Sequence, residues 1–217
     1  MNLKEMSEDI WRELHKLNSI MRINRTEFRI WKKTCCAYRD HQLYFSETED
    51  AFVESMIMGI GRLLDRTKGV LSMEKWLLKG AKANPKEIDM KKLREAKVAY
   101  DKLVRSAVAK TILEIRHNYY AHAQPKWDVE ETMKRITWKQ LFETIESLQD
   151  IFNMAASAGM GNNSLFGEDT IHIMGFPASN IEKDVEAMLL AIEKECHSDE
   201  NHQWQIERAQ MHHDKPS

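Results

Sequence analysis

The helical spacing of apolar residues constrains the fold of this chain more than any other feature. From Ser7 to about Tyr44, apolar side chains recur every three or four residues, the period of an amphipathic helix. This pattern predicts either one long helix or two helices with a break near Asn24. Helix-breaking residues are scarce, with 8 glycines and 4 prolines among 217 residues, and this favours helix over sheet.

Later helices are predicted from their start and stop signals. A Ser or Thr followed three residues later by Glu or Gln forms a capping box, and such pairs occur at Ser46/Glu49, Thr137/Gln140 and Ser179/Glu182. Pro85 is tolerated near a helix start, and the residue before Pro125 avoids helical geometry. The predicted helices cover about 47–66, 72–82, 85–124, 137–158 and 179–196.

Two segments interrupt this helical pattern. Residues 125–136 form a polar connection, and the Gly-rich stretch 159–178 lacks helical periodicity, although 170–174 could be a short extended piece. We therefore predict an all-α fold, an antiparallel helical bundle with an irregular Gly-rich insertion before the last helix. One domain is expected over 1–196, followed by a polar, mobile C-terminal tail over 197–217.

Charge and cysteine content argue against several classes of function. The formal net charge is −2, so a large basic surface for duplex nucleic acid is not expected, although a local basic cleft remains open. Cys35, Cys36 and Cys196 form no CxxC pair, and the tail histidines lack further ligands at suitable spacing, so neither a metal site nor a cofactor is predicted. The N-terminus lacks a signal-peptide core and no apolar run reaches a membrane span of roughly 18 residues. A cytoplasmic protein without a membrane partner is expected.

The residues best suited to chemistry lie in the segment 115–122, which reads IRHNYYAH. Arg116 and His122 stand there with five residues between them, near the end of the predicted 85–124 helix. Arginine holds phosphate through a planar fork of donors, and histidine moves a proton near pH 7. Such a pair could cut RNA without a metal, because one group takes the 2′-OH proton and the other stabilises charge on the phosphate oxygens. A chance pairing of Arg and His in a helix is the alternative.

The spacing of this pair bears on assembly. Six positions along a regular α-helix rotate by about 600°, which leaves the two side chains about 120° apart. Either the helix ends or distorts between Arg116 and His122, or a partner chain completes the site. A symmetric twofold interface could bring two copies of the pair together, so a homodimer is predicted.

Neighbours of the pair are candidates for substrate binding. Tyr120 could stack on a base of single-stranded RNA, while Tyr119 follows the apolar stripe and is assigned to the core. Asn118 could bind phosphate or sugar, or could simply face solvent. His117 could assist His122 or cap the helix C-terminus, where a cation is favoured.

Two blocks of sequence resemble the HEPN superfamily. Residues 116–122 resemble its R-x(4–6)-H motif, with polar His117 after the arginine and an Ala–His ending. The segment Gly59–Asp65, followed by Leu71-Ser72-Met73, resembles the RLxD…LS segment of the abortive-infection U-type branch. The order of the predicted helices agrees as well, and the resemblance covers roughly residues 5–160.

This resemblance implies a function and a set of partners. Many members are ribonucleases whose two motif helices meet in a homodimer, and they serve as toxins or in anti-phage defence, some with an antitoxin protein. Arg116 and His122 would then be catalytic, with single-stranded RNA as substrate. The alternative is a non-catalytic HEPN dimer that binds a nucleotide, RNA or a partner protein. Arg62 and Asp65 could form a local ion pair or support the motif helix.

Overall fold

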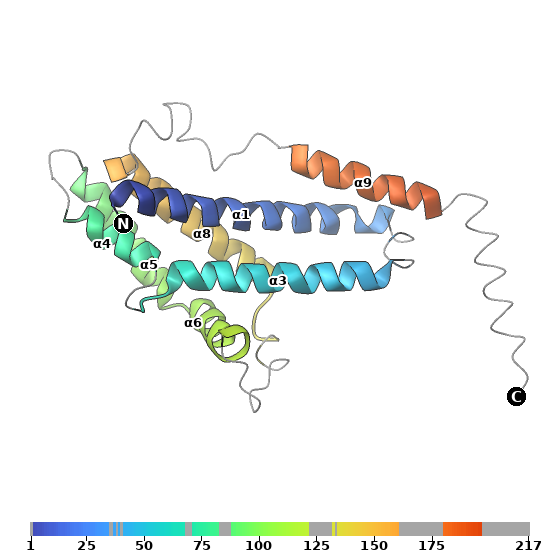
Figure 1. Cartoon of the computed structure of the whole chain (residues 1–217), viewed down its shortest axis with the longest axis horizontal. Helices are drawn as coiled ribbons and strands as arrows, with labels where there is room; N and C mark the ends of the chain where they lie inside the picture. The colour runs from blue at the N-terminus through green and yellow to red at the C-terminus, as the bar shows by residue number, and fades with distance from the viewer. Residues whose placement is uncertain are drawn as a thin grey trace, which may run out of the picture. The chain divides into compact units, whose positions relative to one another are not determined.

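The structure, a computed structural model, is helical wherever its described residues adopt regular structure (Figure 1). The all-α prediction is therefore confirmed. The α-helices are α1 (Leu3–Ile30), α3 (Gln42–Leu64), α4 (Met73–Gly80), α5 (Met90–Val104), α6 (Ala107–Ile115), α8 (Trp138–Ala155) and α9 (Asn180–Cys196). The described residues are 2–34, 37, 39, 41–67, 71–82, 88–121, 132, 134–160 and 180–196.

Contacts divide the chain into two compact units. Unit 1 comprises Met1–Met21 and Phe52–Pro177, and unit 2 comprises Arg22–Ala51 and Ala178–Ser217. Both α1 and α3 contribute one part to each unit. The single domain expected over 1–196 stays a prediction, and the insertion 161–178, Ser179 and the tail lie outside the described residues.

The first helix, α1, differs from both alternatives predicted for the N-terminal segment. α1 runs through Asn24 without interruption and ends at Ile30, where a short 3-10 turn, Trp31–Lys33, follows. An asparagine inside a helix costs at most about 0.7 kcal/mol relative to alanine, and packing readily offsets that cost. The alternative with a break near Asn24 is therefore wrong, and so is a single helix as far as Tyr44, because α1 ends at Ile30 and α3 begins at Gln42.

The second helix begins earlier than its predicted capping box. α3 starts at Gln42, so Ser46 lies inside the helix and caps nothing. The extra turn carries Phe45, which is 4% exposed in the core of unit 2. Burial of an aromatic ring contributes more than a cap, so tertiary packing overrides the local signal.

The predicted helix over 85–124 is two α-helices. α5 begins at Met90, with Asp89 accepting hydrogen bonds from the backbone N–H groups of Lys91 and Lys92, and it ends at Val104. Ser106 then adopts an extended backbone (φ −63°, ψ 153°) and caps α6 by accepting a bond from Ala109 N. Pro85 lies outside the described residues.

The predicted helix over 137–158 is confirmed in its start. Thr137 and Gln140 form a complete capping box at the N-terminus of α8. After Ala155 the backbone widens into a π-helical stretch, Ala156–Met160, in which Gly159 has φ 99°. That left-handed conformation suits glycine and ends the helical path.

One apolar core holds unit 1 together. It joins buried side chains of α4, α5, α6 and α8 to those of the α1 and α3 segments in this unit. Trp76 stacks on Phe152 with ring centroids 5.0 Å apart, and its indole N–H donates to Ser7 Oγ at 2.7 Å. The buried indole therefore keeps its polar atom satisfied while its ring fills the core.

Unit 2 has a smaller core of Ile30, Phe45 and Leu189, with Val185 packed against it. An ion pair supports the apolar contact, since Arg29 Nη2 lies 2.8 Å from Glu186 Oε2. The buried carboxylate of Glu193 accepts a hydrogen bond from Ala37 N at 2.8 Å. These contacts pack α9 within unit 2.

Candidate functional site

The motif helix changes geometry at Arg116. The α-helical pattern ends at Ile115, and the backbone from Arg116 to Ala121 is π-helical, closing its turns with i→i+5 hydrogen bonds. A distorted helix was one of the explanations considered for the spacing of Arg116 and His122. The helix is indeed distorted from Arg116 onward. Such wide turns occur frequently at functional sites.

An aspartate from the end of α3 holds Arg116. Arg116 Nη1 donates to Asp65 Oδ2 at 2.8 Å, across 51 positions of the chain. The two side chains are mostly buried, with 21% of Arg116 and 12% of Asp65 exposed. A charge-assisted bond of this length is stronger than a neutral one, and partial burial reduces its screening by salt.

A glycine on α3 makes room for the arginine. A Cβ atom at Gly61 would lie 2.3 Å from Arg116 Cδ, so the arginine stem crosses the helix where no side chain stands. Arg116 Nε is buried there without a hydrogen-bond partner among the described residues. The guanidinium is thus fixed by packing and by one carboxylate, while 21% of the Arg116 side chain stays exposed.

The surroundings of Asp65 keep it ionised. Burial opposes its charge, but hydrogen bonds from Thr67 and Arg116, together with the charge of Arg116, outweigh burial and lower the pKa of Asp65. Thr67 N donates to Asp65 Oδ1 at 2.7 Å, so the turn after α3 holds one oxygen while Arg116 holds the other. The carboxylate therefore works as a fixed anchor for the arginine.

Only some of the predicted site residues can be located. His122 lies outside the described residues, as do the side chains of Tyr119 and Tyr120, so their assignments stay predictions. His117 is exposed and Asn118 is half-buried.

The sequence allows two roles for Asp65, a local ion pair with Arg62 or support of the helix that carries Arg116. The local ion pair is wrong, because Arg62 Nη1 binds Glu13 Oε2 at 3.2 Å while Asp65 binds Arg116. The supporting role suggested by the resemblance is confirmed for Asp65. The glycine that accommodates Arg116 was not anticipated, although its place in the RLxD block was a signal.

Two negative findings apply to the described residues alone. No group of three or more His, Cys, Asp or Glu side chains is arranged there to hold a metal ion. None of the helices in that part of the chain is long and apolar enough to cross a membrane.

The all-α frame and the contact of Asp65 in the RLxD segment with Arg116 agree with the resemblance to the HEPN superfamily. The family model HEPN_AbiU2, described as AbiU2, matches residues 2–164. The chain therefore belongs to this family, and the resemblance read from the sequence is confirmed. Family membership suggests a nuclease or defence role. No curated protein and no solved structure gave a match to the chain.

Proposed function

We propose that the protein is a metal-independent endoribonuclease of the HEPN type, with a toxin or anti-phage defence role, acting on single-stranded RNA. The observation that carries this proposal is the anchored arginine. Asp65 and Gly61 fix Arg116, yet its side chain remains 21% exposed and keeps donors for a phosphate. A charged group held in advance where negative charge develops stabilises a transition state effectively.

The reaction would be an attack within the RNA strand. His122 accepts the 2′-OH proton while the 2′-oxygen forms a bond to phosphorus, and Arg116 stabilises the charge on the phosphate oxygens. The bond from phosphorus to the 5′-oxygen breaks, and that oxygen takes a proton from a second acid. The products are a 2′,3′-cyclic phosphate and a 5′-OH end.

A homodimer would supply the second acid. In a twofold assembly the partner's copy of the motif adds another histidine and another arginine to the same cleft. His117, Asn118 and Tyr120 would bind the substrate strand beside the catalytic pair. A separate antitoxin protein is a further partner consistent with this role.

The test compares substitutions of the pair with matched controls. Arg116→Lys and His122→Ala should each lower the cleavage rate by about 10²–10³-fold, because each removes a group acting in the transition state and lysine lacks the bidentate fork. Arg94→Lys and His41→Ala, both at exposed positions, should cut at the wild-type rate. Circular dichroism establishes that every variant is folded.

The second candidate function is that of a non-catalytic HEPN dimer that binds a nucleotide, RNA or a protein. The Arg116–Asp65 pair by itself gives the arginine a structural reason to be present. Cleavage by folded Arg116→Lys and His122→Ala at the wild-type rate would exclude the catalytic roles. A wild-type protein that binds RNA without cutting it would establish the second candidate.

A further inference from the structure

The end of α3 is held by a buried tyrosine of α5. Tyr100 is fully buried, and its hydroxyl lies 3.4 Å from Leu63 O and 3.3 Å from Leu64 O. These carbonyls belong to the last turn of α3, where backbone acceptors lack partners within the helix. Burial raises the pKa of Tyr100, so the hydroxyl keeps its proton and donates to them.

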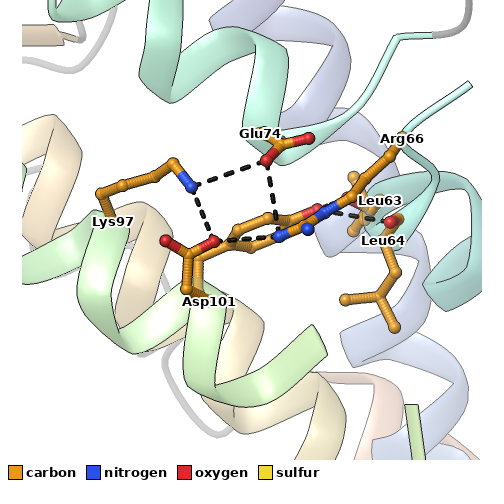
Figure 2. Close-up of polar contacts among 7 residues, drawn as sticks. Leu63, Leu64, Arg66, Glu74, Lys97 and Asp101 are labelled. Carbon is orange, nitrogen blue, oxygen red and sulfur yellow. Dashed lines mark hydrogen bonds and ion pairs between the residues drawn. The ribbon is translucent and has the colours of Figure 1, made fainter. Parts of the chain in front are cut away.

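Arg66, the residue after Asp65, is held by a closed ring of charges. Arg66 Nη2 lies 2.9 Å from Asp101 Oδ1 and 3.4 Å from Glu74 Oε1. Lys97 Nζ lies 2.6 Å and 3.5 Å from the same two oxygens. Figure 2 shows Arg66 and Lys97 each reaching both carboxylates, so α4, α5 and the turn after α3 are joined at one point.

Asp65 lies between these two attachments. Leu64, the residue before it, accepts a hydrogen bond from Tyr100, and Arg66, the residue after it, belongs to the charge ring. Both cations also lie over the Tyr100 ring, with Arg66 Cζ 5.9 Å and Lys97 Nζ 5.7 Å from its centroid. The tyrosine and the ring of charges thus form one connected group.

We propose that Arg66, Glu74, Lys97, Tyr100 and Asp101, together called the α3 clamp, are positioning residues that set the place of Asp65 and, through it, of Arg116. Two fixed neighbours leave the Asp65 backbone little freedom, and its carboxylate is the protein group that holds Arg116 Nη1. These ion pairs are only partly buried, with 19–45% of each side chain exposed, and solvent screening limits what each contributes to stability. Their effect here is geometric, because a 1 Å error in a catalytic group can cost about 10² in rate.

The experiment measures both activity and the state of Arg116, and its kinetic part rests on the proposed ribonuclease function. Tyr100→Phe removes only the hydroxyl, and Asp101→Asn removes one charge of the ring without changing the side-chain shape. Each should lower kcat by about tenfold with KM unchanged within about twofold. Arg94→Gln changes an exposed α5 cation outside the clamp and should leave kcat unchanged.

A double-mutant cycle separates positioning from general stability. In an Asp65→Asn background, Asp101→Asn should cause no further loss of kcat, because the clamp acts through Asp65. A role in overall stability would give losses that add. Retention of wild-type kcat by both clamp variants, or fully additive losses in the cycle, would overturn the proposal.

A nuclear magnetic resonance measurement keeps the proposal testable if the wild-type protein does not cleave RNA. The Arg116 Nε–H signal, assigned by its absence in Arg116→Lys, should shift or broaden in Asp101→Asn and stay unchanged in Arg94→Gln. An unchanged signal in Asp101→Asn would refute the clamp whatever the activity. Inactive wild-type protein with a shifted signal would instead refute the ribonuclease proposal and retain the clamp.

Discussion

Gly61→Ala should inactivate the protein while leaving it folded. The added Cβ would lie 2.3 Å from Arg116 Cδ, whereas ordinary van der Waals contact begins at 3.4 Å. The arginine stem must therefore move by about 1.1 Å, the difference between these two distances. A displacement of that size at a catalytic group corresponds to a loss of about 10² in rate.

This variant should stay folded, because two effects on its stability partly cancel. Alanine in a helix interior is favoured over glycine by about 1 kcal/mol. Weakening of the bond between Arg116 and Asp65 costs about 1.5–3 kcal/mol if it is lost completely. These effects oppose each other, so the free energy of unfolding should fall by no more than about 2 kcal/mol.

The assay pairs single-stranded RNA cleavage with urea unfolding, and Gly59→Ala is the matched control on the same helix. Its Cβ would meet Glu13 Oε1 at 2.6 Å and Leu17 Cδ2 at 2.8 Å, away from Arg116. That variant should lose stability but retain the wild-type rate per folded molecule. If Gly61→Ala cuts as fast as wild type, the placement of Arg116 over Gly61 has no part in the reaction.

Three further predictions concern pH, a helix cap and metal. Burial, then the charge of Glu49, raises the pKa of Glu27 from 4.5 to about 7, so its contribution to stability is full below pH 4.5 and is lost as pH rises through 7. At pH 8 the free energy of unfolding of Glu27→Gln, measured with urea, should therefore exceed that of wild type by up to about 3 kcal/mol, and at pH 4 the two proteins should differ little. Equal differences at both pH values would contradict this. Ser106→Ala should lower the free energy of unfolding by about 1 kcal/mol through loss of the 3.1 Å cap on α6, and Ser106→Asp should restore it in thermal melts. RNA cleavage should continue in excess EDTA, because the mechanism proposed for Arg116 and His122 uses no metal; activity that stops in EDTA and returns with magnesium would disprove that mechanism.

Local signals in the sequence predicted well which segments are helical, but they predicted some helix boundaries poorly. The Thr137/Gln140 pair predicted the start of α8 because both halves of the capping box are present and nothing competes with them. The Ser46/Glu49 pair failed because burial of Phe45 extends α3 by another turn. Ser106 was missed because Ala109 stands three residues later, so no capping-box pair marks the break.

The candidate site, too, could be predicted from the sequence only in part. The motif arginine could be found from sequence because its residue type and spacing are visible locally. Its attachment to Asp65 spans 51 positions, and no helical period relates the two residues. The family resemblance placed Asp65 near the motif helix, but the 2.3 Å approach of the arginine stem to Gly61 needed three-dimensional structure.

The π-helical turn that begins at Arg116 has a consequence for the comparison of related sequences. A turn closed by i→i+5 bonds takes in one more residue than a turn closed by i→i+4 bonds. A chain can therefore gain or lose one residue after the arginine by switching between the two kinds of turn. Motifs with four, five or six residues between arginine and histidine are then related by insertion without a new fold. Alignments of such chains should match turns of the helix and not residue counts.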